Sequence, residues 1–262
     1  MTESNAKMRG AKPRATLWSV VALILCTIAH AQNIDRPPEP MPPPTLAPSV
    51  QRLLEGNLLT GEQKRTARLR HGTWTEDDLT TAAERARAAL VRGAIDDPSL
   101  MSPDADRLDR AEAMALRGQL SEALALLAGQ SSVRAIRLRA EALERLGLFD
   151  EADAALDPLL ARMAARPIDS GDELAEGVRA LMVRNRLRGP ERAGQAGADF
   201  RSLMTLLGRA KNELDRLSWQ ARLVEAEILL DKENPTDAQA ALRETLSLNP
   251  RCARAWRLLG DM

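Results

Sequence analysis

Apolar residues recur three and four positions apart from Ser49 to the end of the chain, among many Ala, Leu, Arg and Glu residues. This spacing places apolar side chains on one face of a helix, and no segment alternates apolar and polar residues as a half-buried strand does. The pattern therefore predicts an all-α protein. Thr75 followed by three acidic residues predicts the start of a helix that ends at Gly93.

Further helix boundaries follow from capping residues. Ser102 with Pro103 predicts the start of a helix that ends at Gly118. Pro158 is expected to kink the helix in which it lies, and the Gly-rich stretch 188–199 is expected to be a loop. The remaining helices are expected at 121–129, 132–146, 150–165, 170–188, 198–213, 215–232 and 236–248.

One short motif occurs twice. Gly118-Gln119-Leu120-Ser121-Glu122-Ala123 is followed 29 residues later by Gly147-Leu148-Phe149-Asp150-Glu151-Ala152. A glycine can end one helix in a left-handed turn, a bulky residue can fill the corner, and a small alanine lets the second helix approach closely. Ala111 and Ala140 each lie seven residues before the glycine, where a small side chain suits the facing helix. The motif predicts helical hairpins.

The pattern continues near the C-terminus with Ala226, Ala238 and Asn249-Pro250, then Trp256 and Leu259-Gly260. Together these motifs resemble the tetratricopeptide repeat, a 34-residue helix-turn-helix unit. The resemblance implies a right-handed α-α superhelical solenoid over residues 100–262 with an incomplete last repeat, and residues 49–99 as a degenerate start. The spacing of 29 residues is short for this family, and Glu233 stands where a glycine belongs. An ordinary helical bundle is the alternative.

Solenoids of this kind bind protein or peptide partners on a concave face, which in this family is lined by the first helix of each hairpin. The resemblance implies partner-binding roles for seven residues, although each could equally be a plain solvent-exposed polar residue. They are Arg134, Arg137, Glu141, Glu144, Arg145, Gln220 and Glu227.

The N-terminus has the order of a secretory signal peptide: four basic residues, an apolar run at 17–29, and Ala29-His30-Ala31. A run of 13 residues is shorter than the about 20 that a permanent membrane helix needs. We expect cleavage near Ala31 and export to the periplasm or the outside of the cell. Membrane contact is expected only through residues 1–31, if they stay uncleaved as an anchor. Residues 32–48 are proline-rich and are expected to form an extended, disordered linker.

Composition argues against several classes of activity. The chain has 37 basic and 37 acidic residues, so it lacks the basic excess of a nucleic-acid-binding protein. The predicted mature chain contains one histidine, His71, and one cysteine, Cys252, so no metal, cofactor or catalytic set is predicted. His71 is expected in the last turn of a helix, where its charge would favour the helix dipole, and Cys252 is expected to be a buried apolar residue.

Two functions remain open at this stage. The first is a non-catalytic scaffold that binds a protein or peptide. The second is the N-terminal repeat region of a longer exported enzyme, such as a peptidase or other hydrolase, with its catalytic part beyond Met262. The second hypothesis depends on Trp256, Leu258 and Leu259, whose apolar side chains lack a predicted partner helix.

Overall fold

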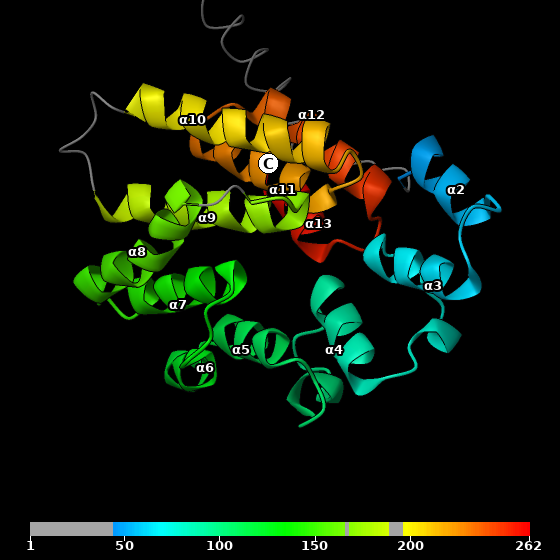
Figure 1. Cartoon of the computed structure of the whole chain (residues 1–262), viewed down its shortest axis with the longest axis horizontal. Coiled ribbons are helices and arrows are strands. Elements are labelled where there is room, and N and C mark those ends of the chain that lie inside the picture. The colour runs from blue at the N-terminus through cyan, green and yellow to red at the C-terminus, as the bar shows by residue number, and fades with distance from the viewer. Residues whose placement is uncertain (1–43, 166–167, 189–195) are drawn as a thin grey trace, which may run out of the picture. The chain divides into compact units, whose positions relative to one another are not determined.

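The computed structural model of the protein describes residues 44–165, 168–188 and 196–262, and within these ranges every regular element is helical (Figure 1). The predicted signal peptide, most of the proline-rich segment and most of the Gly-rich stretch lie outside the described residues. The α-helices are α2 (Pro48–Glu55), α3 (Gly61–Arg70), α4 (Ala82–Val91), α5 (Arg107–Leu116), α6 (Leu120–Leu127), α7 (Val133–Arg145), α8 (Phe149–Ala165), α9 (Gly171–Leu187), α10 (Ala196–Arg209), α11 (Trp219–Asp231), α12 (Pro235–Leu248) and α13 (Ala253–Gly260). None of these helices has the length and hydrophobicity that a membrane crossing requires.

The helix predicted at 75–93 is wrong in its first third. Thr75 precedes only a short 3₁₀ helix (Glu76–Asp78), and α4 begins after Thr81, whose hydroxyl accepts from the Glu84 amide at 3.1 Å. Asp78 accounts for the interruption, because its carboxylate accepts from the Thr75 amide at 2.9 Å and also binds Arg68 of α3. The chain is thereby tied to α3 before α4 can start.

The start predicted at Ser102 is also wrong. Ser102 follows a second 3₁₀ helix (Pro98–Met101), and α5 begins four residues further on, after Asp106. The Asp106 carboxylate accepts from the Leu108 and Asp109 amides at 2.8 and 3.2 Å, which is a complete N-cap. The other predicted helices occur close to their expected ranges, and α8 runs through Pro158 as one helix. A π-helical turn at Ala210–Leu214 follows α10.

The two predicted hairpin corners are equivalent. Gly118 and Gly147 have φ values of 82° and 77°, so both corners use the left-handed conformation that favours glycine. Glu233 takes the same conformation, with φ 55°, at the position where the third motif lacks a glycine. One detail is wrong: Phe149, which was expected to fill its corner, has 57% of its surface exposed.

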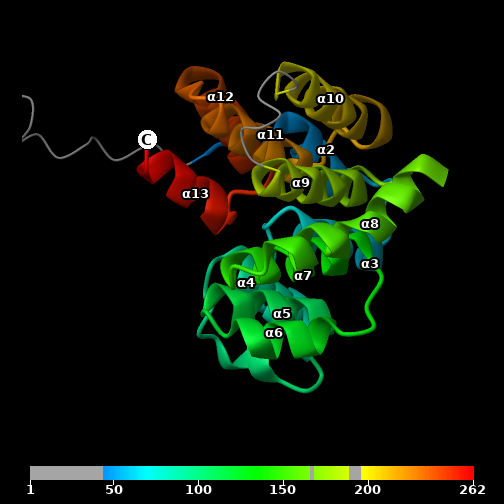
Figure 2. The same ribbon diagram turned by 90° about the vertical axis from the view of Figure 1, so that its left-hand side faces the viewer.

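The small residues of the motifs lie between the helices of each pair. The helix pairs are α5 with α6, α7 with α8, and α11 with α12 (Figure 2). The motif alanines of these pairs are fully buried. These residues are Ala111, Ala123, Ala140, Ala152, Ala226 and Ala238. Side chains larger than methyl would push the paired helices apart, so the motif acts through close packing.

The first helices of successive pairs also contact one another: α5 packs on α7, α7 on α9, and α9 on α11. The main hydrophobic core lies along these contacts and includes Ile136, Val178 and Val224. Adjacent packing of consecutive helix pairs is therefore present in the described part of the chain.

The two ends of the described unit are in contact. The Ala47 amide donates to the Ser247 carbonyl at 2.8 Å, and the Trp219 indole donates to the Arg70 carbonyl at 2.9 Å. Val50 of α2 is fully buried in one core cluster with residues of α11, α12 and α13. The segment 44–72 therefore packs against the last helices instead of simply preceding the first pair.

This contact changes the expectation for the C-terminal apolar residues. Leu259 is 7% exposed and belongs to the same cluster as Val50, with Trp256 and Leu258 packed against it. The Trp256 indole also donates to the Pro250 carbonyl at 2.9 Å. These side chains thus have partners within the described residues, and they no longer provide an argument for a missing helix.

The single histidine of the described residues differs from its expected role. His71 is the C-cap residue of α3, but it is buried, and its Nδ1 lies 3.0 Å from the Leu248 carbonyl oxygen. Burial lowers the pKa of His71, which favours the neutral ring over a cation at the helix end. Cys252 is 3% exposed, as expected of a buried apolar residue.

Candidate ligand-binding cleft

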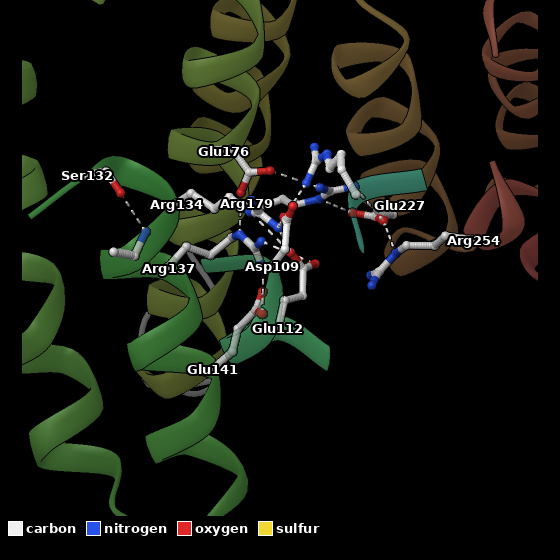
Figure 3. Close-up of polar contacts among 12 residues, drawn as sticks. Asp109, Glu112, Ser132, Arg134, Arg137, Glu141, Glu176, Arg179, Glu227 and Arg254 are labelled. Carbon is white, nitrogen blue, oxygen red and sulfur yellow. Dashed lines mark hydrogen bonds and ion pairs between the residues drawn. The ribbon is translucent and has the colours of Figure 1, made fainter. Parts of the chain in front are cut away.

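Charged residues on successive first helices form the most distinctive polar arrangement of the molecule (Figure 3). Three of these helices each present two charged residues three positions apart, a spacing that puts both on one helix face. The pairs are Asp109 and Glu112 on α5, Arg134 and Arg137 on α7, and Glu176 and Arg179 on α9. Arg87 of α4, Glu141 of α7, Glu227 of α11 and Arg254 of α13 complete the array.

Arg134 connects α7 to α5. Its Nη2 lies 2.6 Å from Asp109 Oδ1, and its Nε lies 3.1 Å from Glu112 Oε2. Arg87 reaches the same Asp109 oxygen from α4 at 3.0 Å. Asp109 is therefore shared between arginines of two helices, which fixes α4 and α7 on either side of α5.

Arg137 is the centre of the array, because three carboxylates surround it. Its Nη1 lies 2.6 Å from Glu141 Oε2, its Nη2 lies 3.7 Å from Glu112 Oε1, and its Nε donates to Glu176 of α9. Only 5% of the Arg137 side chain is exposed. A buried guanidinium with several carboxylate partners holds α5, α7 and α9 in one relative position.

The array continues from α9 to the last helix. Arg179 donates two hydrogen bonds to Glu227 of α11, from Nε to Oε2 at 2.9 Å and from Nη2 to Oε1 at 3.2 Å. Glu227 in turn accepts from Arg254 of α13. A continuous series of ion pairs thus extends from α4 to α13.

The buried glutamates of this array stay ionised. Burial raises the pKa of Glu176, but Arg137 and Arg179 more than compensate, so its pKa lies below the ordinary value. Burial likewise raises the pKa of Glu227, and Arg179 and Arg254 lower it further than burial raises it. The array is consequently a set of ionised groups rather than neutral hydrogen-bonding groups.

These pKa shifts predict a loss of stability in acid. An unfolded chain has glutamate pKa values of about 4.3, and Glu176 and Glu227 have lower pKa values in the folded protein. Such a glutamate contributes its full stabilisation at any pH above about 4.3, and this contribution is lost as the pH falls through the folded-state pKa. We expect the free energy of unfolding, from urea titrations, to fall steeply below about pH 4.5. Glu227→Gln should make this dependence shallower, and an unchanged slope would contradict the assignment.

A cleft of about 420 Å³ lies along the array. Its lining comes from α4, α5, α7, α9, α11 and α13, and includes Arg134, Arg137, Glu176 and Arg179. A second hollow of about 550 Å³ adjoins it and shares Arg87, Arg134, Trp219 and Gln220 with the first. The two hollows therefore share part of their lining, and together they form one candidate site.

Two buried polar atoms of this site lack a hydrogen-bond partner among the described residues. They are Oε1 of Gln220, which lines both hollows, and Nε1 of Trp74, which lines the second. The guanidinium of Arg251 lies over the Trp74 ring, 4.6 Å from its centroid. Buried polar groups are normally paired, so these two atoms are candidate hydrogen-bond partners for a ligand, which the movement of neighbouring side chains would have to uncover.

The sequence-predicted site residues divide into two groups. Arg134, Arg137 and Gln220 line the cleft, and Glu141 and Glu227 bind arginines that line it. The other two lie elsewhere, and each is already paired. Glu144 binds Arg186 at 2.8 Å, and Arg145 donates to the Ala115 carbonyl at 2.6 Å.

Sequence reasoning missed several residues of the site. Arg87, Glu176 and Arg179 belong to helices without a recognisable motif residue, and Arg254 lies two residues before Trp256 at a position to which the resemblance assigned no role. The charge pair of α9, three positions apart, was the one available signal, and it is common on solvated helix faces. Among the described residues, no cluster of histidine, cysteine or acidic side chains could hold a metal ion.

Comparisons with protein-family models, with curated proteins and with solved structures found no match to this chain. The class of protein thus rests on the coordinates of the described residues: an all-α protein whose helices pack in adjacent pairs.

Proposed function

We propose that the helix pairs form a tetratricopeptide-like solenoid whose cleft binds an extended peptide segment of a protein partner. The observation that carries this proposal is the origin of the cleft lining. First helices α5, α7, α9 and α11 all contribute to it, which is the arrangement that the family resemblance implies for a binding face.

Size and chemistry favour a peptide. Pockets of about 300–1,000 Å³ hold drug-sized molecules, and the two adjoining hollows of about 420 and 550 Å³ offer room for a few residues of an extended chain. A peptide backbone carries an amide donor and a carbonyl acceptor at nearly every residue. Gln220 Oε1 and Trp74 Nε1 supply the complementary acceptor and donor.

The proposed role is binding without catalysis. Burial raises the pKa of Cys252, so the thiolate that a nucleophile requires is disfavoured at this edge of the cleft. The carboxylates of the array are occupied by arginines, which lowers their ability to accept a proton from a substrate. The N-terminal sequence supports the further proposal that the protein acts after export, in the periplasm or at the cell surface.

The test is selection of short random peptides displayed on phage against the immobilised protein, followed by fluorescence anisotropy with the selected peptides. We expect Gln220→Leu to weaken binding about threefold to tenfold, because one hydrogen bond to the peptide is lost. Thermal unfolding of the variant should be nearly unchanged, since Gln220 Oε1 has no partner among the described residues.

The matched control is Gln239→Leu on α12, an exposed glutamine that does not line either hollow. Its peptide affinity should equal that of the unmodified protein. Failure to select any peptide, or equal affinities for the two leucine variants, would contradict a peptide site at this cleft.

A further inference from the structure

We infer that the peptide recognised by this cleft is acidic, with its carboxylates bound by arginines at the rim; this inference rests on the proposed function. The first observation is the sign of the groups that face the cleft. The adjoining hollow of about 550 Å³ is lined by three arginines and four carboxylates, but the cleft of about 420 Å³ is lined by seven arginines against two glutamates, Glu112 and Glu176. Three of these arginines are Arg134, Arg137 and Arg179 of the floor, and the other four are Arg87, Arg92, Arg254 and Arg257.

The position of the compensating carboxylates explains why this lining is cationic. Asp109, Glu141 and Glu227 bind lining arginines without lining the cleft of about 420 Å³ themselves. Several of the carboxylate partners of these arginines are therefore not part of the lining of this cleft. Positive groups in a cleft with low-dielectric walls focus their field into the opening and attract anionic ligands.

Floor and rim arginines have different roles. The side chains of Arg134, Arg137 and Arg179 are 17%, 5% and 13% exposed, and their carboxylate partners hold them in place. The rim is more accessible: the side chains of Arg87 and Arg254 are 44% and 51% exposed. Both bind carboxylates that are themselves buried, Asp109 and Glu227. Each of these carboxylates has a second arginine partner, Arg134 or Arg179, that keeps it paired when the rim arginine turns toward a ligand.

Arg257 is the clearest ligand-contacting residue. It is exposed on α13, lines the cleft, and has no ion-pair partner among the residues that the structure describes. Arginine is suited to planar, bidentate binding of carboxylates. Arg254 lies three residues before Arg257 on α13, a spacing that puts both side chains on one helix face. Both can therefore reach one acidic segment.

The unpaired Gln220 acceptor favours a peptide over other polyanions. It lines the same cleft, and an amide oxygen needs a donor such as a backbone N–H. Ionised phosphate groups and carboxylates supply acceptors alone, so the donor must come from another part of the ligand; nucleic-acid bases also carry N–H donors. A ligand with carboxylates at the rim and peptide amides at the floor meets both requirements, and a DNA strand tests the nucleic-acid alternative.

The experiment uses three fluorescein-labelled peptides of equal length, in which glycine alternates with glutamate, glutamine or lysine, and a single-stranded DNA of similar length. We expect only the glutamate peptide to bind clearly. Its affinity should fall about fivefold to tenfold in Arg257→Glu, because a favourable charge contact becomes repulsive, and less in Arg254→Gln. Added salt should weaken binding in parallel.

Arg243→Glu on α12 is the matched control, since Arg243 is exposed and does not line the cleft. Equal binding of the glutamine and glutamate peptides would overturn the acidic preference while leaving the peptide function intact. Equal or tighter binding of the DNA would overturn peptide recognition at the rim. Equal losses in Arg257→Glu and Arg243→Glu would place the acidic ligand elsewhere, whereas failure of the phage selection would concern the proposed function itself.

Discussion

Replacing Arg137 by methionine is expected to lower the free energy of unfolding by about 3–5 kcal/mol, the range found when one partner of a buried ion pair is removed. Methionine keeps most of the aliphatic volume of the side chain, so the loss of charge dominates. Glu141 would lose its arginine partner, and Glu112 and Glu176 would each keep one arginine, Arg134 and Arg179 respectively, in place of two. Glu176 is only 16% exposed. Urea titrations followed by circular dichroism at helical wavelengths measure the effect.

The control for this variant is Arg243→Met, an exposed site where a change within about 0.5 kcal/mol is expected. The double variant Arg137→Met with Glu176→Gln should recover part of the stability, because it removes one of the negative charges that Arg137 balanced. A loss below about 1 kcal/mol for Arg137→Met would mean that water or neighbouring groups solvate these carboxylates. The burial of Arg137 would then add little to the fold.

This result also bears on how the candidate site is tested. From sequence alone, Arg134, Arg137 and Arg145 were predicted alike to be partner-binding residues on one face. The structure separates them: Arg137 is buried among carboxylates, while Arg145 donates to the Ala115 carbonyl away from the cleft. Binding is therefore better tested at Arg257 and Gln220, and stability at Arg137.

Features encoded by neighbouring residues were predictable from the sequence. The corners at Gly118 and Gly147 follow from a glycine in left-handed conformation and a small alanine on each helix, all within one hairpin. At both Thr75 and Ser102 several capping residues compete for the helix start. At Thr75 the contact between Asp78 and Arg68 of α3 decides the outcome, and at Ser102 the N-cap formed by Asp106 does.

Features that depend on distant residues were not predictable. The partner of Arg137 on α9 is 39 residues away, so the helical spacing of Arg137 indicated its face but not its burial. His71 and Leu248 are separated by 177 residues, and no local pattern marks either as a contact. Without such long-range information, the C-terminal apolar residues looked uncovered.

The second large effect is expected at this contact between the two ends of the described unit. Replacing Val50 by aspartate should lower the free energy of unfolding by about 3–5 kcal/mol, because a carboxylate would be buried among apolar groups without a partner. Val50 has no exposed surface and shares its core cluster with Leu242, Leu246 and Leu259. The fold can avoid this cost only by releasing α2 from the cluster.

Release of α2 has its own signature, which separates it from global unfolding. The connection at 56–60 contains Leu58, which is 97% exposed, so limited proteolysis there should become faster once α2 is no longer held. Tryptophan emission should shift to longer wavelength, since Trp219 and Trp256 belong to or pack against the same cluster.

Ser49→Asp is the matched control: it adds the same charge one residue earlier, at an exposed position. Equal stability and equal cleavage rates for the two aspartate variants would show that α2 does not cover the last helices, and the apolar face of α13 would again need another partner.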